Sequence, residues 1–329
     1  MVTHEPANPF PQFLLHIGAA RAASTLLQNW FLAHPQLRYV VRGIAGLETT
    51  TDVGGLAEQF LTAKQVRYLV TSEEAFSGTW LPRETARATD ATRKMWGKRG
   101  RQNVTSRKPN PYRVYEGAPH EILRAKCLLL KQLFPSAHVL YITRGLEATL
   151  RSYYTLNAQR GIWNKPTDIM GYLKASPELG AMLDYDFVIA LYREQYGTEF
   201  VHVLPYELLR DNANEFFGAL ENELGLEHFP FSTRRVNASL NARELYWQIL
   251  FSRWAARLER LTKIPFQQAF LRTFAASPRA TRTVRLLART SRSQVALEID
   301  PQFLETFRGC ASSLEKNPRY AGYAREYLF

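Results

Sequence analysis

Short apolar runs alternate with helix-like patterns along this chain, and this alternation limits its fold more than any other feature. Four apolar runs have the length and composition of buried strands: residues 12–17, 66–71, 138–143 and 200–204. Patterns with helical spacing follow or separate them: residues 24–34, 120–134, 146–157 and 185–196. Because strands that alternate with helices are typical of βαβ units, the sequence predicts an α/β fold with a mostly parallel sheet flanked by helices.

Two segments interrupt this rhythm. Residues 78–118 place glycines and prolines among basic residues, which predicts a long inserted loop. Residues 243–329 are expected to form a helical C-terminal elaboration, in which 243–261 is the clearer helix and a separate helical subdomain is the alternative. A length of 329 residues suits one large domain or two smaller ones, and we expect a single α/β domain over residues 1–329.

The charge of the chain is basic and unevenly placed. Lys and Arg number 42 against 30 Asp and Glu, which gives a net charge of +12. The excess lies mainly in residues 81–113 and 253–292. Such surfaces attract polyanions, acidic lipid headgroups or phosphorylated small molecules. The alternative is that the basic runs only keep the protein in solution.

The remaining composition excludes several classes of protein. Hydrophobic residues make up 46% and charged residues 22%, which is typical of a globular chain. The apolar stretches are far shorter than the ~20 residues that a membrane-spanning helix needs, and the N-terminus has no secretory pattern. Two cysteines are too few for a disulfide framework or a cysteine-rich metal site. We therefore expect a cytoplasmic protein.

The first candidate site is a loop of small residues between the first strand and the helix after it. The loop and the start of the helix read Gly18, Ala19, Ala20, Arg21, Ala22, Ala23, Ser24 and Thr25. Small side chains let backbone N–H groups approach an anion, and a helix N-terminus adds a partial positive charge. An ATPase loop would have Gly-Lys-Ser/Thr where this chain has Ala-Ser-Thr. The pattern predicts an anion cradle, with an ordinary βα turn as the alternative.

The second candidate site follows the strand at residues 138–143. Arg144 stands at the carboxyl end of that strand, where open α/β sheets bind their ligands. Ser152 comes eight residues later, about two helical turns on, so the two side chains are suited to hold one phosphate. The alternatives are an ion pair between Arg144 and Glu147 and a solvated helix position for Ser152.

These motifs, in this order, resemble the sulfotransferases that use 3′-phosphoadenosine 5′-phosphosulfate (PAPS), in particular the bacterial type. Residues 18–25 resemble the family's 5′-phosphosulfate loop, and residues 139–153 resemble its 3′-phosphate motif. Residues 192–209 resemble the tyrosine-rich helix, strand and Tyr-Glu segment of the family. The resemblance covers residues 10–76 and 120–240 and implies a P-loop-like parallel sheet with the PAPS site at the strand ends.

The resemblance also implies roles for single residues. Arg21 would contact the 5′-phosphate and the bridging oxygen, while Ser24 and Thr25 would hold the 5′-phosphate. Arg144 and Ser152 would clamp the 3′-phosphate of PAPS and of its product, 3′-phosphoadenosine 5′-phosphate (PAP).

The chain departs from the family at several points. Ala22 and Ala23 stand where many members have Ser-Gly, and Gly145 replaces a common polar residue. The C-terminal Arg-Lys-Gly element of animal cytosolic members is absent. Arg234 and Arg235 resemble a bacterial counterpart, and either one is a candidate cofactor contact.

Catalysis of sulfuryl transfer requires a cation and, for a hydroxyl acceptor, a general base. Negative charge grows on the bridging oxygen, so Arg21 is the expected cation, and the scheme needs no metal. The second predicted strand runs into Glu73 and Glu74, which resemble the Ser-x-Glu segment of bacterial members. We expect Glu74 to be the base, with Glu73 next and His120 as a further candidate; capping of the following helix is the alternative for both carboxylates. His16, on the first strand, is expected in the core.

The acceptor is the least constrained part of the prediction. The expected acceptor is a hydroxyl (or amine) of an oligosaccharide or other carbohydrate, of a lipid-linked molecule or of a small molecule, recognised by the basic insert. Residues 253–292 are suited to contact with a membrane surface. No nucleic-acid-binding module is visible, and the sequence leaves the oligomeric state open. The alternatives to an enzyme of this type are a non-catalytic nucleotide- or polyanion-binding protein and a P-loop-type kinase.

Overall fold

The computed structural model describes residues 11–19, 22–39, 66–73, 76–77, 119–159, 169–176, 179–232, 240–261 and 278–329. Its centre is one sheet of five parallel strands in the order β2-β3-β1-β4-β5. The strands are β1 (Gln12–His16), β2 (Leu37–Tyr39), β3 (Tyr68–Ser72), β4 (His138–Thr143) and β5 (Val201–Pro205). The predicted α/β class with a parallel sheet is therefore confirmed.

The four strands predicted from apolar runs are all present, shifted by no more than two residues at either end. Every residue of β3 and β5 is buried, which explains why these strands are continuous apolar runs and not alternating ones. The sequence did not reveal β2, because three residues that include Arg38 are too short to form a pattern. This strand lies at one edge of the sheet, beside β3.

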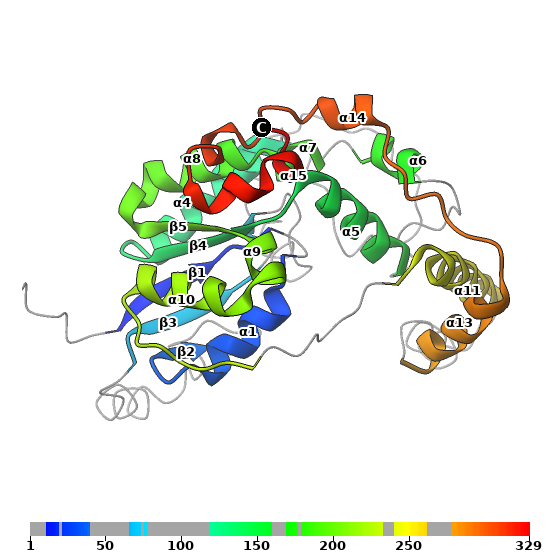
Figure 1. Ribbon diagram of the computed structural model, residues 1–329, viewed down its shortest axis with the longest axis horizontal. Coiled ribbons are helices and arrows are strands. Elements are labelled where there is room, and N and C mark those ends of the chain that lie inside the picture. Colours follow the sequence, from blue (N-terminus) through cyan, green and yellow to red (C-terminus); the bar gives the residue numbers. More distant parts are fainter. Residues whose placement is uncertain are drawn as a thin grey trace, which may run out of the picture.

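The direction of each crossover determines which face of the sheet a helix covers. From β1 the chain passes through α1 (Ser24–Ala33) to β2 on one side, whereas β3 passes through α4 (Pro119–Leu133) to β4 on the other side. Because such crossovers are right-handed, α1 and α4 lie on opposite faces. Figure 1 shows this arrangement, with α8 (Tyr185–Tyr196) beside α4 and α10 (Ala213–Leu224) beside α1.

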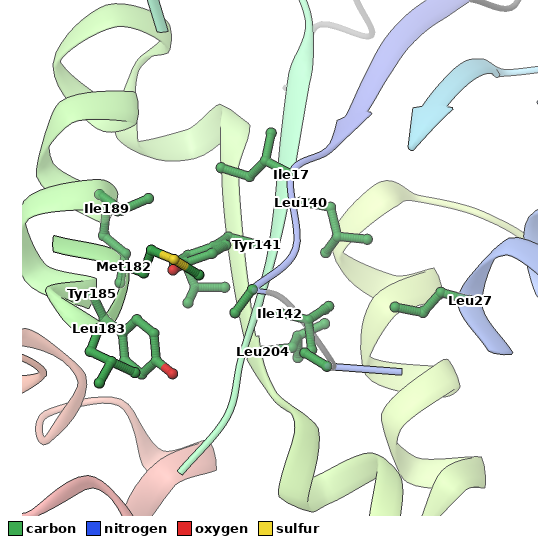
Figure 2. Packing of buried hydrophobic residues seen from close by; sticks show 14 of the residues in the cluster. Ile17, Leu27, Leu140, Tyr141, Ile142, Met182, Leu183, Tyr185, Ile189 and Leu204 are labelled. Atoms are coloured by element: carbon green, nitrogen blue, oxygen red, sulfur yellow. The ribbon is translucent and has the colours of Figure 1, made fainter. Parts of the chain in front are cut away.

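The core fills both faces of the sheet. Figure 2 shows Tyr141 of β4 directed toward Tyr185 and Ile189 of α8, and Leu140 directed toward Leu27 of α1. Alternate residues of a strand point to opposite faces, so β4 supplies side chains to both halves of the core. On the α1 face, Trp30 stacks on Phe217 of α10 with ring centroids 5.2 Å apart.

The C-terminal third is mainly helical and returns to the sheet. From β4 the chain enters α5 (Leu146–Gln159), which contacts α11 (Ala242–Leu261), and α11 in turn packs on α13 (Pro278–Thr290). The final segment comes back to the β4–β5 side of the sheet, as Figure 1 shows for α15 (Ala324–Tyr327). The remaining short helices are α6 (Ile169–Lys174), α7 (Leu179–Leu183), α9 (Tyr206–Asp211), α14 (Pro301–Glu305), η2 (Thr198–Phe200), η3 (Ser312–Leu314) and η4 (Pro318–Tyr323).

Two sequence predictions about segments need separate mention. Residues 78–118, the predicted basic insert, lie outside the described residues. Among the helices that the structure describes, none is both long and apolar enough to cross a membrane.

Candidate functional site

The loop after β1 begins as an extension of the sheet. The N–H groups of Ile17 and Ala19 donate to the carbonyl oxygens of Leu140 and Ile142, both at 3.0 Å. The start of the loop therefore runs beside the last residues of β4. Arg144 follows Ile142 by two residues. The two predicted phosphate sites therefore lie together at the carboxyl ends of the neighbouring strands β1 and β4.

A tight turn then leads into α1. Ala22 donates its N–H to the carbonyl of Ala19 at 3.1 Å, and Ala23 takes a left-handed conformation with φ 59° and ψ 25°. The carbonyl of Ala23 accepts the first helical hydrogen bonds, from Leu26 and Leu27. Because alanine has no side-chain oxygen, Ala23 cannot cap the first N–H groups of α1. The N-terminus of α1, with Ser24 and Thr25 in its first turn, thus lies at the carboxyl ends of the strands. Ala20 and Arg21 lie outside the described residues.

Gly18 cannot be replaced without moving its neighbours. A Cβ atom at this position would lie 2.6 Å from Nε2 of His16. The Gly18 carbonyl also accepts a hydrogen bond from the Ser77 hydroxyl at 2.8 Å. The segment after β3 is therefore tied directly to the loop.

A buried polar cluster connects β1, β3 and α1 beneath the loop. His16 Nδ1 and the Ser72 hydroxyl lie 2.8 Å apart, and the side-chain amide of Gln28 donates to the same hydroxyl at 3.2 Å. The N–H of Glu73 donates to the carbonyl of His16 at 3.1 Å. His16 is fully buried, and burial lowers its pKa to about 4, so the ring is neutral near pH 7. The prediction that His16 is a core residue is confirmed.

The candidate bases differ in their surroundings. Glu73 follows the carboxyl end of β3, and its backbone is fixed by His16 and by a turn that accepts the N–H of Phe76. Glu74 lies outside the described residues. His120 lies in the first turn of α4, where Nε2 is 3.0 Å from the carboxylate of Asp184. Since Asp184 also caps α8, His120 has a structural partner in the α4–α8 contact.

Arg144 is held by contacts to its backbone and to its side chain. The carbonyl of Arg144 accepts hydrogen bonds from the hydroxyls of Tyr185 at 2.6 Å and Thr149 at 3.2 Å. The guanidinium lies over the ring of Tyr206, 4.7 Å from its centroid, in a cation–π contact. Glu147, the alternative partner considered for Arg144, accepts a hydrogen bond from Arg151 one turn further along α5.

The Glu207 side chain also holds the loop that carries Arg144. Its carboxylate accepts the N–H of Gly145 at 3.0 Å and the hydroxyl of Tyr327 at 2.7 Å. The side chain is fully buried, and this burial raises the pKa of Glu207 while the two hydrogen bonds oppose the rise. The adjacent residues Tyr206 and Glu207 therefore both act on the Arg144 loop, which gives the Tyr-Glu segment a structural role.

The C-terminal segment completes this support. The Thr143 hydroxyl lies 2.7 Å from the hydroxyl of Tyr320 and 3.0 Å from that of Tyr327. A Cβ atom on Gly145 would lie 2.9 Å from Cβ of Glu326 and 3.1 Å from its carbonyl oxygen. The close approach of α15 explains why a glycine follows Arg144 in this chain.

The other predicted site residues fall into two groups. Ser152 is buried on α5, so the alternative of a solvated helix position is wrong. Arg234 and Arg235 lie outside the described residues. Within the part of the chain that the structure describes, no group of three or more His, Cys, Asp or Glu side chains could hold a metal ion.

Sequence reasoning missed one ionisable residue near the site. Lys126 lies in the buried stripe of α4 with Leu123, Cys127 and Leu130, and burial lowers the pKa of Lys126 to about 7, a shift that the charge of Glu73 opposes. The signal was present in the sequence, because a lysine at helical spacing among apolar residues breaks an otherwise apolar face.

Comparisons with known proteins add no family to this geometry. No protein-family model matches the chain, and no curated protein matches it closely enough to count as a relative.

Proposed function

We propose that this protein is a PAPS-dependent sulfotransferase with a P-loop-like site. The proposal is carried by one observation: the N-terminus of α1, which Ala23 does not cap, and Arg144 lie together at the carboxyl ends of β1 and β4. The crossovers from these two neighbouring strands lead to opposite faces of the sheet, α1 on one and α8 on the other. Such a switch point is where open α/β sheets bind nucleotides.

The loop and α1 are suited to the 5′-phosphosulfate end of the donor. Ala23 supplies no side-chain cap to the first N–H groups of α1, so an anion can bind them, and the dipole of α1 makes this favourable. Ser24 and Thr25 add hydroxyl donors in the first turn. In this proposal Arg21 supplies the charge that stabilises the bridging oxygen as the sulfur–oxygen bond breaks.

The Arg144 loop is suited to the 3′-phosphate. A guanidinium fits phosphate oxygens with two parallel hydrogen bonds, provided that its position is fixed. Here Tyr185 and Glu207 fix the backbone, and Tyr206 orients the side chain. Ser152, buried on α5, is the proposed second contact to the same phosphate.

The acceptor side of the reaction requires a base near the end of β3. The acceptor oxygen forms a bond to sulfur, the bond from sulfur to the bridging oxygen breaks, and its electron pair leaves with the 5′-phosphate of PAP. The hydroxyl proton passes to Glu74 or Glu73. His120 is the weaker candidate, because it is already engaged with Asp184.

The acceptor itself is proposed by chemical class. We propose a hydroxyl or amine of a carbohydrate, lipid or small molecule, recognised by the basic residues 78–118. Both cysteines, Cys127 and Cys310, are free thiols, as is usual for a cytoplasmic protein, and a cytoplasmic location is part of the proposal.

A basic helix face gives the proposal a candidate membrane contact. On α13, Val284 and Ala288 are buried, whereas Leu286 is 61% exposed among exposed arginines. Those arginines are Arg282, Arg285 and Arg289, and Arg285 also lies 3.7 Å from Glu244. An exposed leucine surrounded by cations is typical of helices that lie on anionic lipid surfaces.

Nucleotide binding tests the proposal against its main rival, a P-loop-type kinase. Calorimetric titration should show binding of PAP and much weaker binding of ATP, since the site is built for a 3′-phosphate and has no Gly-Lys pair. The R144M variant should bind PAP about 10- to 100-fold more weakly, because a charged hydrogen bond contributes about 1.5–3 kcal/mol. The matched control is R151M, which removes an exposed arginine from α5. Tighter binding of ATP than of PAP would favour the kinase.

Transfer of a sulfur label tests the enzyme against a non-catalytic binding protein. [³⁵S]PAPS is incubated with a panel of phenol, sugar and alkyl-glycoside acceptors, using wild type, E74A and E73A. Loss of labelling in one of these variants, but not in the control E147A, which changes an exposed side chain of α5, would identify the base. Binding of PAP with no labelled acceptor and no release of sulfate would favour the non-catalytic alternative.

A further inference from the structure

The buried ring of His16 has one nitrogen that bonds its neighbours and one that does not. The ring lies on the α1 side of the sheet, where it contacts Phe31 edge to face with centroids 5.6 Å apart. Nδ1 is 2.8 Å from the Ser72 hydroxyl, whereas Nε2 is buried and has no hydrogen-bond partner among the described residues. Buried polar atoms in native proteins are nearly all paired, so an orphan of this kind indicates a bound water, ion or ligand.

Nε2 is directed at the loop that leads into α1. A Cβ atom on Gly18 would lie 2.6 Å from Nε2 but 3.5 Å from Cδ2, so the tip of the ring faces Gly18. The N–H groups of Ile17 and Ala19 both bond β4, so the chain is still extended here and residues 16 and 18 share one face of the sheet. This is the face that α1 covers. Nε2 therefore lies beneath the start of the loop, on the side of the helix N-terminus that Ala23 leaves uncapped.

The hydrogen bonds of Ser72 determine which nitrogen of His16 carries the proton. The side-chain amide of Gln28 donates to the Ser72 hydroxyl at 3.2 Å. If this hydroxyl donates to Nδ1, the ring proton is on Nε2, and the Nε2–H group alone lacks a partner. If Nδ1–H donates instead, both the Nε2 lone pair and the Ser72 O–H lack one, because the described residues offer that hydroxyl no other acceptor. The first arrangement leaves fewer buried groups unpaired and is therefore favoured.

We propose that His16 is a ligand-binding residue whose Nε2–H donates a hydrogen bond to an anionic oxygen held by the loop and the N-terminus of α1. The inference rests on the proposed function: the oxygen belongs to the 5′-phosphosulfate of PAPS and, after transfer, to the 5′-phosphate of PAP. The ring is neutral near pH 7 because burial lowers its pKa, and it neither gains nor loses a proton in the reaction. Gly18 is then required, since a side chain at this position would cover Nε2.

Two variants separate the two nitrogens of the ring. The side-chain amide of glutamine reaches the position of Nε2, whereas that of asparagine reaches only the position of Nδ1. We expect H16N to bind PAP about 10- to 100-fold more weakly than wild type, which is the effect of losing one hydrogen bond to a charged group. H16Q should bind PAP within about 5-fold of wild type. If His16 served only the core, the two variants would bind PAP alike, and this result would overturn the proposal.

Adenosine 3′-monophosphate is the matched control ligand, because it has the 3′-phosphate of PAP and lacks the 5′-phosphate. H16N should bind it within about 2-fold of wild type. Equal losses for both nucleotides would indicate general damage to the fold and would overturn the assignment of His16 to the 5′ end.

NMR of the histidine rings in wild type gives a readout that does not depend on how well the variants fold. Long-range ¹H–¹⁵N spectra should show the proton on Nε2 in the free protein. The Nε2 signal should shift when PAP is added and stay in place with adenosine 3′-monophosphate. A proton on Nδ1, or an Nε2 signal that PAP leaves unchanged, would contradict the proposal.

Failure of this inference is distinguishable from failure of the proposed function. Wild type that binds PAP and transfers the sulfur label, with equal PAP affinities of H16N and H16Q, would overturn the role of His16 alone. Wild type that does not bind PAP, but binds inorganic pyrophosphate more tightly than H16N does, would overturn the sulfotransferase and keep the contact of His16 with an anion. Wild type that binds neither PAP nor pyrophosphate would overturn both.

Discussion

The buried carboxylate of Glu207 accepts the N–H of Gly145 at 3.0 Å and thereby supports the loop that presents Arg144. A second residue, Tyr327 near the C-terminus, donates to the same carboxylate at 2.7 Å. One acidic side chain of α9, the short helix after β5, thus joins α9 to the end of β4 and to the last helix. Glu207 lies 62 residues after Gly145 and is fully buried. It therefore supports the Arg144 loop from inside the protein, and not through contact with a ligand.

Replacement of Glu207 by glutamine should disturb this support with little change in volume. The amide has one acceptor oxygen, so when that oxygen accepts the Gly145 N–H, the amide NH2 faces the Tyr327 hydroxyl, which must stop donating and accept instead, and both hydrogen bonds lose the charge of the carboxylate. We expect E207Q to lower the free energy of unfolding by about 1–3 kcal/mol, measured by urea denaturation. It should also weaken PAP binding by moving Arg144. The control is E147Q, at an exposed carboxylate of α5; unchanged stability and PAP affinity in E207Q would contradict the role assigned to Glu207.

Replacement of Ala23 by glycine should stabilise the protein. The left-handed conformation at φ 59° is unfavourable for a residue with a Cβ atom and costs glycine nothing. We expect A23G to raise the free energy of unfolding by about 0.5–1 kcal/mol, the strain relieved less the added entropy of the unfolded chain. The same change in an ordinary helix, A148G in α5, should instead cost about 1 kcal/mol. A loss of stability in A23G equal to that of A148G would show that the turn stores no strain.

The fold could be predicted from sequence because buried parallel strands are continuous apolar runs. β3, β4 and β5 required only that signal, and α8 (Tyr185–Tyr196) has the bounds that the helical pattern over 185–196 predicted. β2 could not be found, because its place is decided by pairing with β3 and not by its own three residues.

The candidate site was less accessible to sequence reasoning, for a physical reason. The small-residue loop and Arg144 are local patterns, so the chain displays them directly. The contact of Ser72 with His16 and Gln28 depends on strand order and register, which bring together residues 56 and 44 positions apart. The contacts of Thr143 with Tyr320 and Tyr327 depend on the return of the C-terminal segment to the sheet, which no local pattern reports.

Burial of His16 should make stability depend on pH. Burial lowers the pKa of His16 from 6.5 to about 4, so between these values the unfolded chain binds a proton that the native protein excludes. The neutral state of His16 therefore contributes about 3 kcal/mol to the free energy of unfolding above pH 6.5, and this contribution is lost as the pH falls toward 4. His138, whose pKa is also lowered to about 4 by burial and by His202, acts in the same direction.

Denaturation at a series of pH values checks this expectation. In H16N the slope of unfolding free energy against pH between 6.5 and 4 should fall by the equivalent of one proton. S72A should lose stability through its missing hydrogen bond to His16 but keep the full slope, because the histidine stays buried. An unchanged slope in H16N would show that His16 is not the group that stays unprotonated in the native protein.

The exposed face of α13 should bind anionic bilayers through its arginines. The helix carries no acidic residue, and Leu286 stands exposed beside Arg282 and Arg289. Each cation near an anionic surface contributes about 1 kcal/mol, so R282Q/R289Q should weaken co-sedimentation of the full chain with phosphatidylserine-containing vesicles by about 10- to 30-fold. The control is R308Q, which removes an exposed arginine outside α13. Arg308 pairs with Glu305. Because the attraction is electrostatic, binding by wild type should fall as salt is raised and be weak to vesicles of phosphatidylcholine alone. Equal binding to both kinds of vesicle, or no loss in the double variant, would show that this face is not a lipid-binding surface.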